Sequence, residues 1–138
     1  MSKALILVAE DDLDTRDTLR QLLETAGYDV VGAEDSILAY GLLQKKPPDV
    51  LLIDIMMPLI DGIGFIRWVR NTPRFVRTPI VAMTAYDERY LREAKEAGAN
   101  LTLRKPGDIP DVAQIIERAL VRSRQYRRTE LTSPGRTA

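Results

Sequence analysis

The 138-residue sequence contains no cysteine and no histidine. The absence of cysteine excludes disulfides, thiol nucleophiles and cysteine-based zinc sites. The absence of histidine excludes serine–histidine triads and histidine metal ligands from this chain. The side chains that remain for chemistry are carboxylates, hydroxyls and lysine.

A net charge and long apolar segments are also missing. Lys and Arg together number 20, as do Asp and Glu, so the formal net charge is zero and no global field favours nucleic acid or an anionic membrane. The apolar runs are too short to span a bilayer, and the N-terminus lacks a signal-peptide core. We therefore expect a globular, cytoplasmic protein that binds neither membrane nor, by itself, nucleic acid.

Five short apolar segments alternate with five amphipathic segments along the chain. Alternation of this kind predicts an α/β fold, a doubly wound parallel sheet with helices on both faces. The expected strands cover residues 4–9, 29–33, 50–54, 79–83 and 100–103. The expected helices cover residues 14–26, 36–44 with Ser36 as N-cap, about 65–72, 87–97 and 110–122. The helix over residues 36–44 is expected to bury Leu38, Leu42 and Leu43.

The central segment, residues 50–62, runs from four apolar residues into Asp54 and on to an Asp61-Gly62 turn. A continuous apolar run of this length is typical of a strand buried on both faces. Asp54 then lies at the carboxyl end of the strand, where open α/β sheets bind their ligands. Other polar side chains stand at the ends of three further expected strands: Glu10, Asp11, Thr84 and Lys105. We expect these side chains to form one site.

The residue types at this site indicate a particular chemistry. Three neighbouring carboxylates repel one another unless a cation lies among them, and carboxylate oxygens suit Mg²⁺. A lysine and a hydroxyl add donors for an oxyanion. A metal, an ammonium group and a hydroxyl around one carboxylate are what phosphoryl transfer to Asp54 requires.

Four segments resemble the receiver domain of two-component response regulators. They are ILVAEDD, LLIDIMMPLIDG, PIVAMTA and LRKP, found in this order, and the resemblance covers residues 3–122. It implies a flavodoxin-like, three-layer α/β/α fold with a five-stranded sheet of order 2-1-3-4-5. It also implies a phosphorylation-controlled switch of partner binding that catalyses only its own phosphorylation and dephosphorylation.

The resemblance implies a Mg²⁺ site. Asp11 corresponds to the direct metal ligand and Glu10 to an acid that acts mainly through water. Asp54 also contacts the metal in this family, and Met56 corresponds to the residue that contributes its backbone carbonyl.

The resemblance also implies roles toward the phosphoryl group. Asp54 corresponds to the phosphoacceptor, which receives the group from a histidine kinase or a histidine phosphotransfer protein. Thr84 corresponds to the switch hydroxyl, Ala85 to a backbone N–H donor, and Lys105 to the lysine that pairs with the phosphoryl group. The activated form binds a downstream protein target, and a homodimer through the fourth and fifth helices is left open.

Two positions depart from the family pattern. Thr102 stands where the family usually has the aromatic switch residue, and Gly107 follows the Lys-Pro pair where an aromatic residue is common. We hypothesise that output proceeds instead through Tyr86 or Tyr90.

Other interpretations are weaker. An aspartate-nucleophile phosphatase of the haloacid-dehalogenase type resembles Asp-x-Asp, whereas Met56 stands two residues after Asp54. A receiver-like interaction module without phosphorylation stays open because of Thr102. The aspartates at 12, 14 and 17 suggest a calcium loop, but the glycine and the final acid of such a loop are missing, so we expect them to cap a helix.

Residues 123–138 are rich in Arg, Ser and Thr, and we expect them to form a disordered tail. The arginines near this end are interpreted as a solvated helix terminus rather than a nucleic-acid contact. The initiating methionine and the fading apolar pattern favour a stand-alone receiver.

Overall fold

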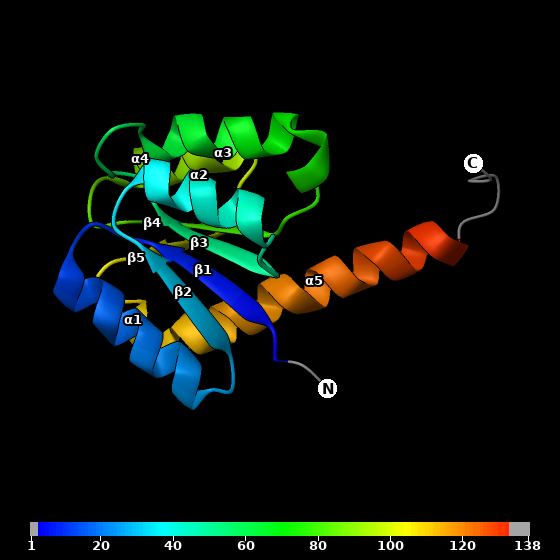
Figure 1. The fold of residues 1–138 in the computed structure, drawn as a ribbon, viewed down its shortest axis with the longest axis horizontal. Coiled ribbons are helices and arrows are strands. Elements are labelled where there is room, and N and C mark those ends of the chain that lie inside the picture. Colours follow the sequence, from blue (N-terminus) through cyan, green and yellow to red (C-terminus); the bar gives the residue numbers. More distant parts are fainter. Residues whose placement is uncertain (1–2, 133–138) are drawn as a thin grey trace.

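The computed structural model describes residues 3–132, with side chains described as far as residue 125. Five strands and five α-helices alternate along this part of the chain (Figure 1). The strands are β1 (Leu5–Ala9), β2 (Asp29–Ala33), β3 (Val50–Asp54), β4 (Ile80–Thr84) and β5 (Leu101–Arg104). The helices are α1 (Leu13–Thr25), α2 (Ser36–Lys45), α3 (Gly62–Asn71), α4 (Glu88–Ala97) and α5 (Val112–Thr132), with 3₁₀ turns η1 (Pro73–Phe75) and η2 (Ile109–Asp111).

The strands form one parallel sheet in the order β2-β1-β3-β4-β5, which confirms the predicted fold class and strand order. Helices α2, α3 and α4 cover one face of the sheet, and α1 and α5 cover the other (Figure 1). All carboxyl ends of the strands therefore meet at one edge, and this edge carries the candidate site.

Alternate residues of the strands build two apolar cores. On β1, Leu7 and Ala9 join the core under α2, α3 and α4, whereas Ile6 and Val8 join the core under α1 and α5. All five residues of β3 are buried, as expected for a central strand covered on both faces. Of the three leucines expected in the core from α2, Leu43 is fully buried and Leu42 is partly buried against the core, but Leu38 is 43% exposed.

An aspartate side chain caps each of four helices by accepting a hydrogen bond from a backbone N–H of the first turn. These caps are Asp12 for α1, Asp35 for α2, Asp61 for α3 and Asp87 for α4. The cap role expected of Asp12 is confirmed. The expectation that Ser36 caps α2 was wrong, because the preceding aspartate accepts from Leu38 N–H and leaves the Ser36 hydroxyl for another partner.

Helix α5 extends to Thr132 and projects beyond the body of the domain (Figure 1). The sequence predicts a disordered tail from residue 123, whereas residues 123–132 are helical in this structure. Arg, Gln and Glu are good helix formers, and no proline occurs between Pro110 and Pro134, so the helix continues after its apolar stripe ends. The rest of the expected tail, residues 133–138, lies outside the described residues.

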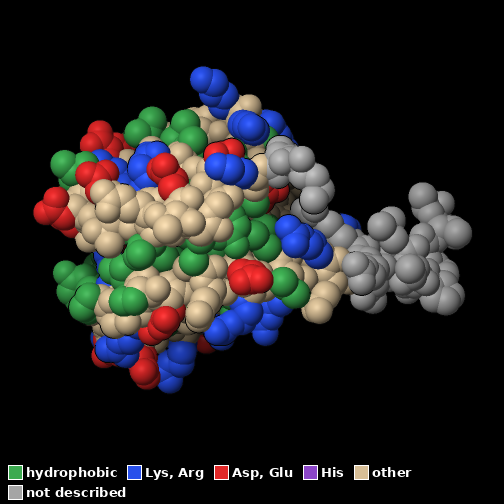
Figure 2. Space-filling view, turned by 90° about the horizontal axis from the view of Figure 1, so that it is seen from below, with side chains coloured by type: hydrophobic (Ala, Val, Ile, Leu, Met, Phe, Trp, Pro, Cys, Tyr) green, Lys and Arg blue, Asp and Glu red, His purple; other side chains and the backbone are tan. Residues whose placement is uncertain are grey.

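Side chains of both charge signs are interspersed over the coloured part of the face seen in Figure 2. This mixture agrees with the zero formal net charge of the whole chain. Within residues 3–132, no helix combines the length and apolarity needed to cross a membrane.

Candidate phosphoryl-acceptor site

Sheet register places the acidic residues at the same level of neighbouring strands. Ala9 on β1 pairs with Ile53 on β3, so Glu10 and Asp54 both come one residue beyond this pair. The backbone N–H of Glu10 continues the ladder to Ala33 O at 2.9 Å. The backbone N–H of Lys105 donates to Thr84 O at 2.9 Å, which places this lysine next to the end of β4.

Lys105 joins two of the acids directly. Its Nζ lies 2.6 Å from Glu10 Oε1 and 2.8 Å from Asp54 Oδ2. Glu10 is fully buried, Asp54 is 4% exposed, and the lysine side chain is also largely buried. The lysine therefore carries a positive charge between two carboxyl groups that water hardly reaches.

Burial governs the protonation of Glu10. The pKa of Glu10 is raised from 4.5 to about 8: desolvation is the largest cause, the neighbouring Asp54 carboxyl adds to it, and Lys105 opposes it. Burial by itself would lower the pKa of the Lys105 ammonium, but its hydrogen bonds and charge interactions with Asp54 and Glu10 outweigh this, and its pKa is raised. The site thus holds a charged lysine and a glutamic acid that stays protonated up to about pH 8.

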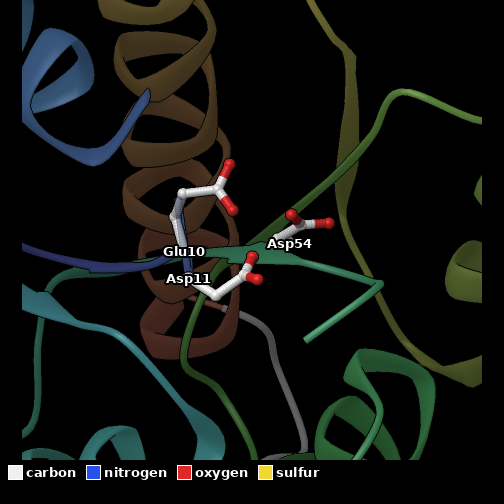
Figure 3. Close-up of side chains that lie close together, drawn as sticks. All are labelled: Glu10, Asp11 and Asp54. Carbon is white, nitrogen blue, oxygen red and sulfur yellow. The ribbon is translucent and has the colours of Figure 1, made fainter. Parts of the chain in front are cut away.

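The three carboxyl groups form a candidate metal centre. One oxygen from each of Glu10, Asp11 and Asp54 lies within 4.8 Å of the others, and the groups face a common space (Figure 3). Asp11 is exposed to solvent, which provides an entry path. Glu10 Oε2 is buried and has no hydrogen-bond partner among the residues that the structure describes, and a cation or its bound water would satisfy that oxygen. This donor set of oxygens fits Mg²⁺.

The remaining expected residues flank this centre. The Met56 backbone N–H donates to Asp54 Oδ1 at 3.0 Å, a contact with the expected acceptor carboxylate that comes in addition to the carbonyl role expected of this residue. Thr84 is fully buried, and its Oγ1 accepts a hydrogen bond from the Tyr86 backbone N–H at 3.1 Å. This bond joins the expected switch hydroxyl to the backbone of one of the two tyrosines hypothesised to carry output. Ala85, the expected N–H donor, lies between them in the sequence and is exposed.

Two positioning contacts were missed from the sequence. Arg16 on α1 donates from Nη1 to Glu10 O at 2.7 Å and so ties the first helix to the acidic segment. Ser36, fully buried at the start of α2, hydrogen-bonds to the loop that follows Asp54. No local sequence pattern predicts either contact, because each joins a side chain to the backbone of a different element.

Comparisons with known proteins agree with this geometry. A family model described as the response regulator receiver domain matches residues 6–117. The chain is 38% identical over 113 residues to an uncharacterized 14.6 kDa protein of Leptolyngbya boryana, covering 81% of this chain and 86% of that protein. It is 37% identical over 122 residues to the transcriptional regulatory protein PdtaR of Mycobacterium tuberculosis, covering 87% of this chain and 58% of PdtaR.

Among solved structures, the chemotaxis response regulator CheY4 of Vibrio cholerae superposes with a TM-score of 0.80 at 30% identity. The match covers 86% of this chain and 100% of CheY4. The chain thus spans nearly the full length of two of these proteins and little more than half of PdtaR.

Proposed function

Because the chain belongs to the response regulator receiver domain family of two-component systems, we propose that it accepts a phosphoryl group on Asp54 from a histidine kinase or a histidine phosphotransfer protein. The observation that carries the proposal is the contact of Lys105 Nζ with Asp54 Oδ2 at 2.8 Å, beside the three-carboxylate cluster. An acceptor carboxylate, a fixed cation and a metal-binding cluster then lie in one partly water-excluded space.

The proposed reaction is an in-line displacement. An Asp54 oxygen forms a bond to phosphorus as the P–N bond to the donor imidazole breaks, and the imidazole leaves with the electron pair and takes up a proton. Lys105 stabilises the oxygens of the transferred group, and the Met56 N–H holds the carboxylate in place. Mg²⁺, when bound, supplies further neutralisation of phosphoryl charge.

The other expected site residues have the remaining roles in the proposal. Asp11 and Asp54 would hold Mg²⁺ directly and Glu10 mainly through water, with the Met56 carbonyl as a further ligand. Thr84 and the Ala85 N–H contact the phosphoryl group in the activated state. The protein catalyses only its own phosphorylation and dephosphorylation, and it works in the cytoplasm by changing its affinity for a downstream protein target.

The test is the intact mass of the protein after incubation with acetyl phosphate and Mg²⁺. We expect a single phosphoryl adduct on the wild type, no adduct when Mg²⁺ is chelated beforehand, and no adduct on an Asp54→Asn variant that keeps the fold. A folded, Mg²⁺-binding wild type without an adduct would contradict the proposal and favour an interaction module that is not phosphorylated.

The phosphoryl group is expected to persist for minutes or longer. Met56 and Tyr86, two residues after Asp54 and Thr84, flank the approach of a hydrolytic water, and neither side chain orients water well. Both are exposed, at 44% and 59%. Decay of the adduct after removal of acetyl phosphate measures the lifetime. A Met56→Glu variant, which adds a water-orienting carboxylate, should shorten it, whereas loss of the wild-type adduct within seconds would contradict this prediction.

A further inference from the structure

The loop between β3 and α3, residues 55–61, contains a backbone conformation that a non-glycine residue rarely adopts. Leu59 has φ = 78°, in the left-handed region where its Cβ is crowded by the backbone. Its side chain is 68% exposed, so packing of that side chain does not explain the conformation. Neighbouring contacts must therefore hold the backbone in this state.

One side chain from another element contacts the backbone on both sides of Leu59. Ser36 Oγ accepts a hydrogen bond from Ile60 N–H at 2.9 Å and donates one to Pro58 O at 3.2 Å. Ser36 is fully buried, and Asp35 already caps its helix. The hydroxyl is thus available for the loop and satisfies two backbone groups that would otherwise lose a partner.

The loop held in this way carries two features of the candidate site. It begins directly after Asp54, and it includes Met56, whose N–H contacts Asp54 Oδ1. At its other end the backbone N–H of Gly62 donates to Ile55 O at 2.7 Å, and a Cβ at Gly62 would lie 2.5 Å from Ile55 Cα. Because Gly62 closes the loop onto Ile55, a change of backbone conformation at Leu59 is confined to the residues between them, and Met56 is one of these.

We propose that Ser36 is a positioning residue for the Mg²⁺ site, because its hydroxyl clamps the loop that presents Met56. The inference rests on the proposed function, in which the Met56 carbonyl is a metal ligand. Ser36 touches neither the metal nor the phosphoryl group. It acts on both through the backbone of residues 58–60.

The experiment compares Mg²⁺ binding by calorimetry in the wild type, Ser36→Ala and Ala39→Gly. The alanine variant removes both hydrogen bonds, and we expect its dissociation constant for Mg²⁺ to rise by about tenfold, as for other groups that orient metal ligands. Ala39→Gly is the matched control, because it weakens the same helix at a buried position without touching the loop. Its dissociation constant should stay within about twofold of the wild type, since a glycine in a helix interior lowers general stability but leaves both loop contacts in place.

Two further measurements separate positioning from general stability. Ser36→Thr keeps the hydroxyl and should restore wild-type Mg²⁺ binding, and the Ile60 amide should exchange its hydrogen faster in Ser36→Ala but not in Ala39→Gly. If the alanine variant does not fold, Ser36→Cys retains the side-chain size with a weak donor and should give the same contrast.

Each outcome decides between the inference and the proposed function. Unchanged Mg²⁺ binding in Ser36→Ala, or equal weakening in Ala39→Gly, would overturn the role of Ser36 even if the wild type forms a phosphoryl adduct. The expected Mg²⁺ contrast without any adduct would overturn the proposed function alone. A wild type that binds no Mg²⁺ would overturn both.

Discussion

Replacing Lys105 with methionine is expected to lower the free energy of unfolding by about 3 kcal/mol at pH 8, the usual cost of removing one partner of a buried ion pair. The ammonium group contacts Glu10 at 2.6 Å and Asp54 at 2.8 Å, and both carboxyl groups are buried. Methionine keeps most of the side-chain volume, so the decrease in the free energy of unfolding is due to the missing charge and not to a cavity.

The same substitution should slow phosphorylation by acetyl phosphate by about 10²–10³-fold, as observed when one donor to a developing oxyanion is removed. Urea unfolding measures the stability change, and the rate of adduct formation by intact mass measures the chemistry. The deficit in stability should shrink toward pH 5, because Glu10, whose pKa is raised to about 8, is then protonated and no longer needs the cation.

Arg104→Met is the matched control for this prediction. Arg104 is the preceding residue and also makes an ion pair, with Glu88 at 3.1 Å, but both side chains are largely exposed. Exposed pairs contribute about 0–1 kcal/mol, so this variant should be nearly as stable as the wild type. Equal losses in the two variants would contradict the argument from burial.

Replacing Glu10 with glutamine is expected to raise the free energy of unfolding of the metal-free protein by about 2 kcal/mol at pH 8.5, because a buried carboxylate no longer has to ionise. The folded-state pKa of Glu10 lies near 8, above its ordinary value of 4.5. The folded state therefore binds this proton more tightly than the unfolded state. The stability that the group contributes is fully present below about pH 4.5 and is lost as the pH rises toward 8.

The pH dependence distinguishes this effect from a change in packing. Glutamine mimics the protonated acid, so the gain should fall close to zero at pH 5 in urea titrations with a chelator present. Mg²⁺ binding should weaken in the same variant, since one acid of the metal-binding cluster loses its charge. Asp11→Asn should weaken Mg²⁺ binding as well, but without the gain in stability, because Asp11 is exposed. A glutamine variant that is destabilised at pH 8.5 would contradict the prediction.

Most of the fold followed from patterns that are local in the sequence. The all-apolar run before Asp54 predicted a strand buried on both faces, and β3 is buried at every residue. The largely polar segment before Gly98 predicted a helix that the structure contains as α4, with Ala94 as its buried residue. Local patterns failed at boundaries and faces: they ended α5 too early, placed Leu38 in the core and assigned the α2 cap to Ser36.

The residues of the candidate site were predictable for the same reason. Carboxyl ends of parallel strands meet at one edge of a sheet, so polar residues that follow apolar runs are brought together whatever the details of packing. The placement of Glu10, Asp11 and Asp54 within 4.8 Å of one another agrees with that rule.

The sequence by itself therefore determined which elements form, in which sheet they lie, and which side chains reach the carboxyl edge of the sheet, because periodicity and strand ends are properties of neighbouring residues. Only the tertiary structure decided how those side chains interact. Lys105 bridges to residues 95 and 51 positions away, and the Ser36 hydroxyl contacts backbone 22 and 24 positions away. Such contacts, and the burial that raises the pKa of Glu10, depend on strand register and on helix packing against the sheet, which no local pattern encodes.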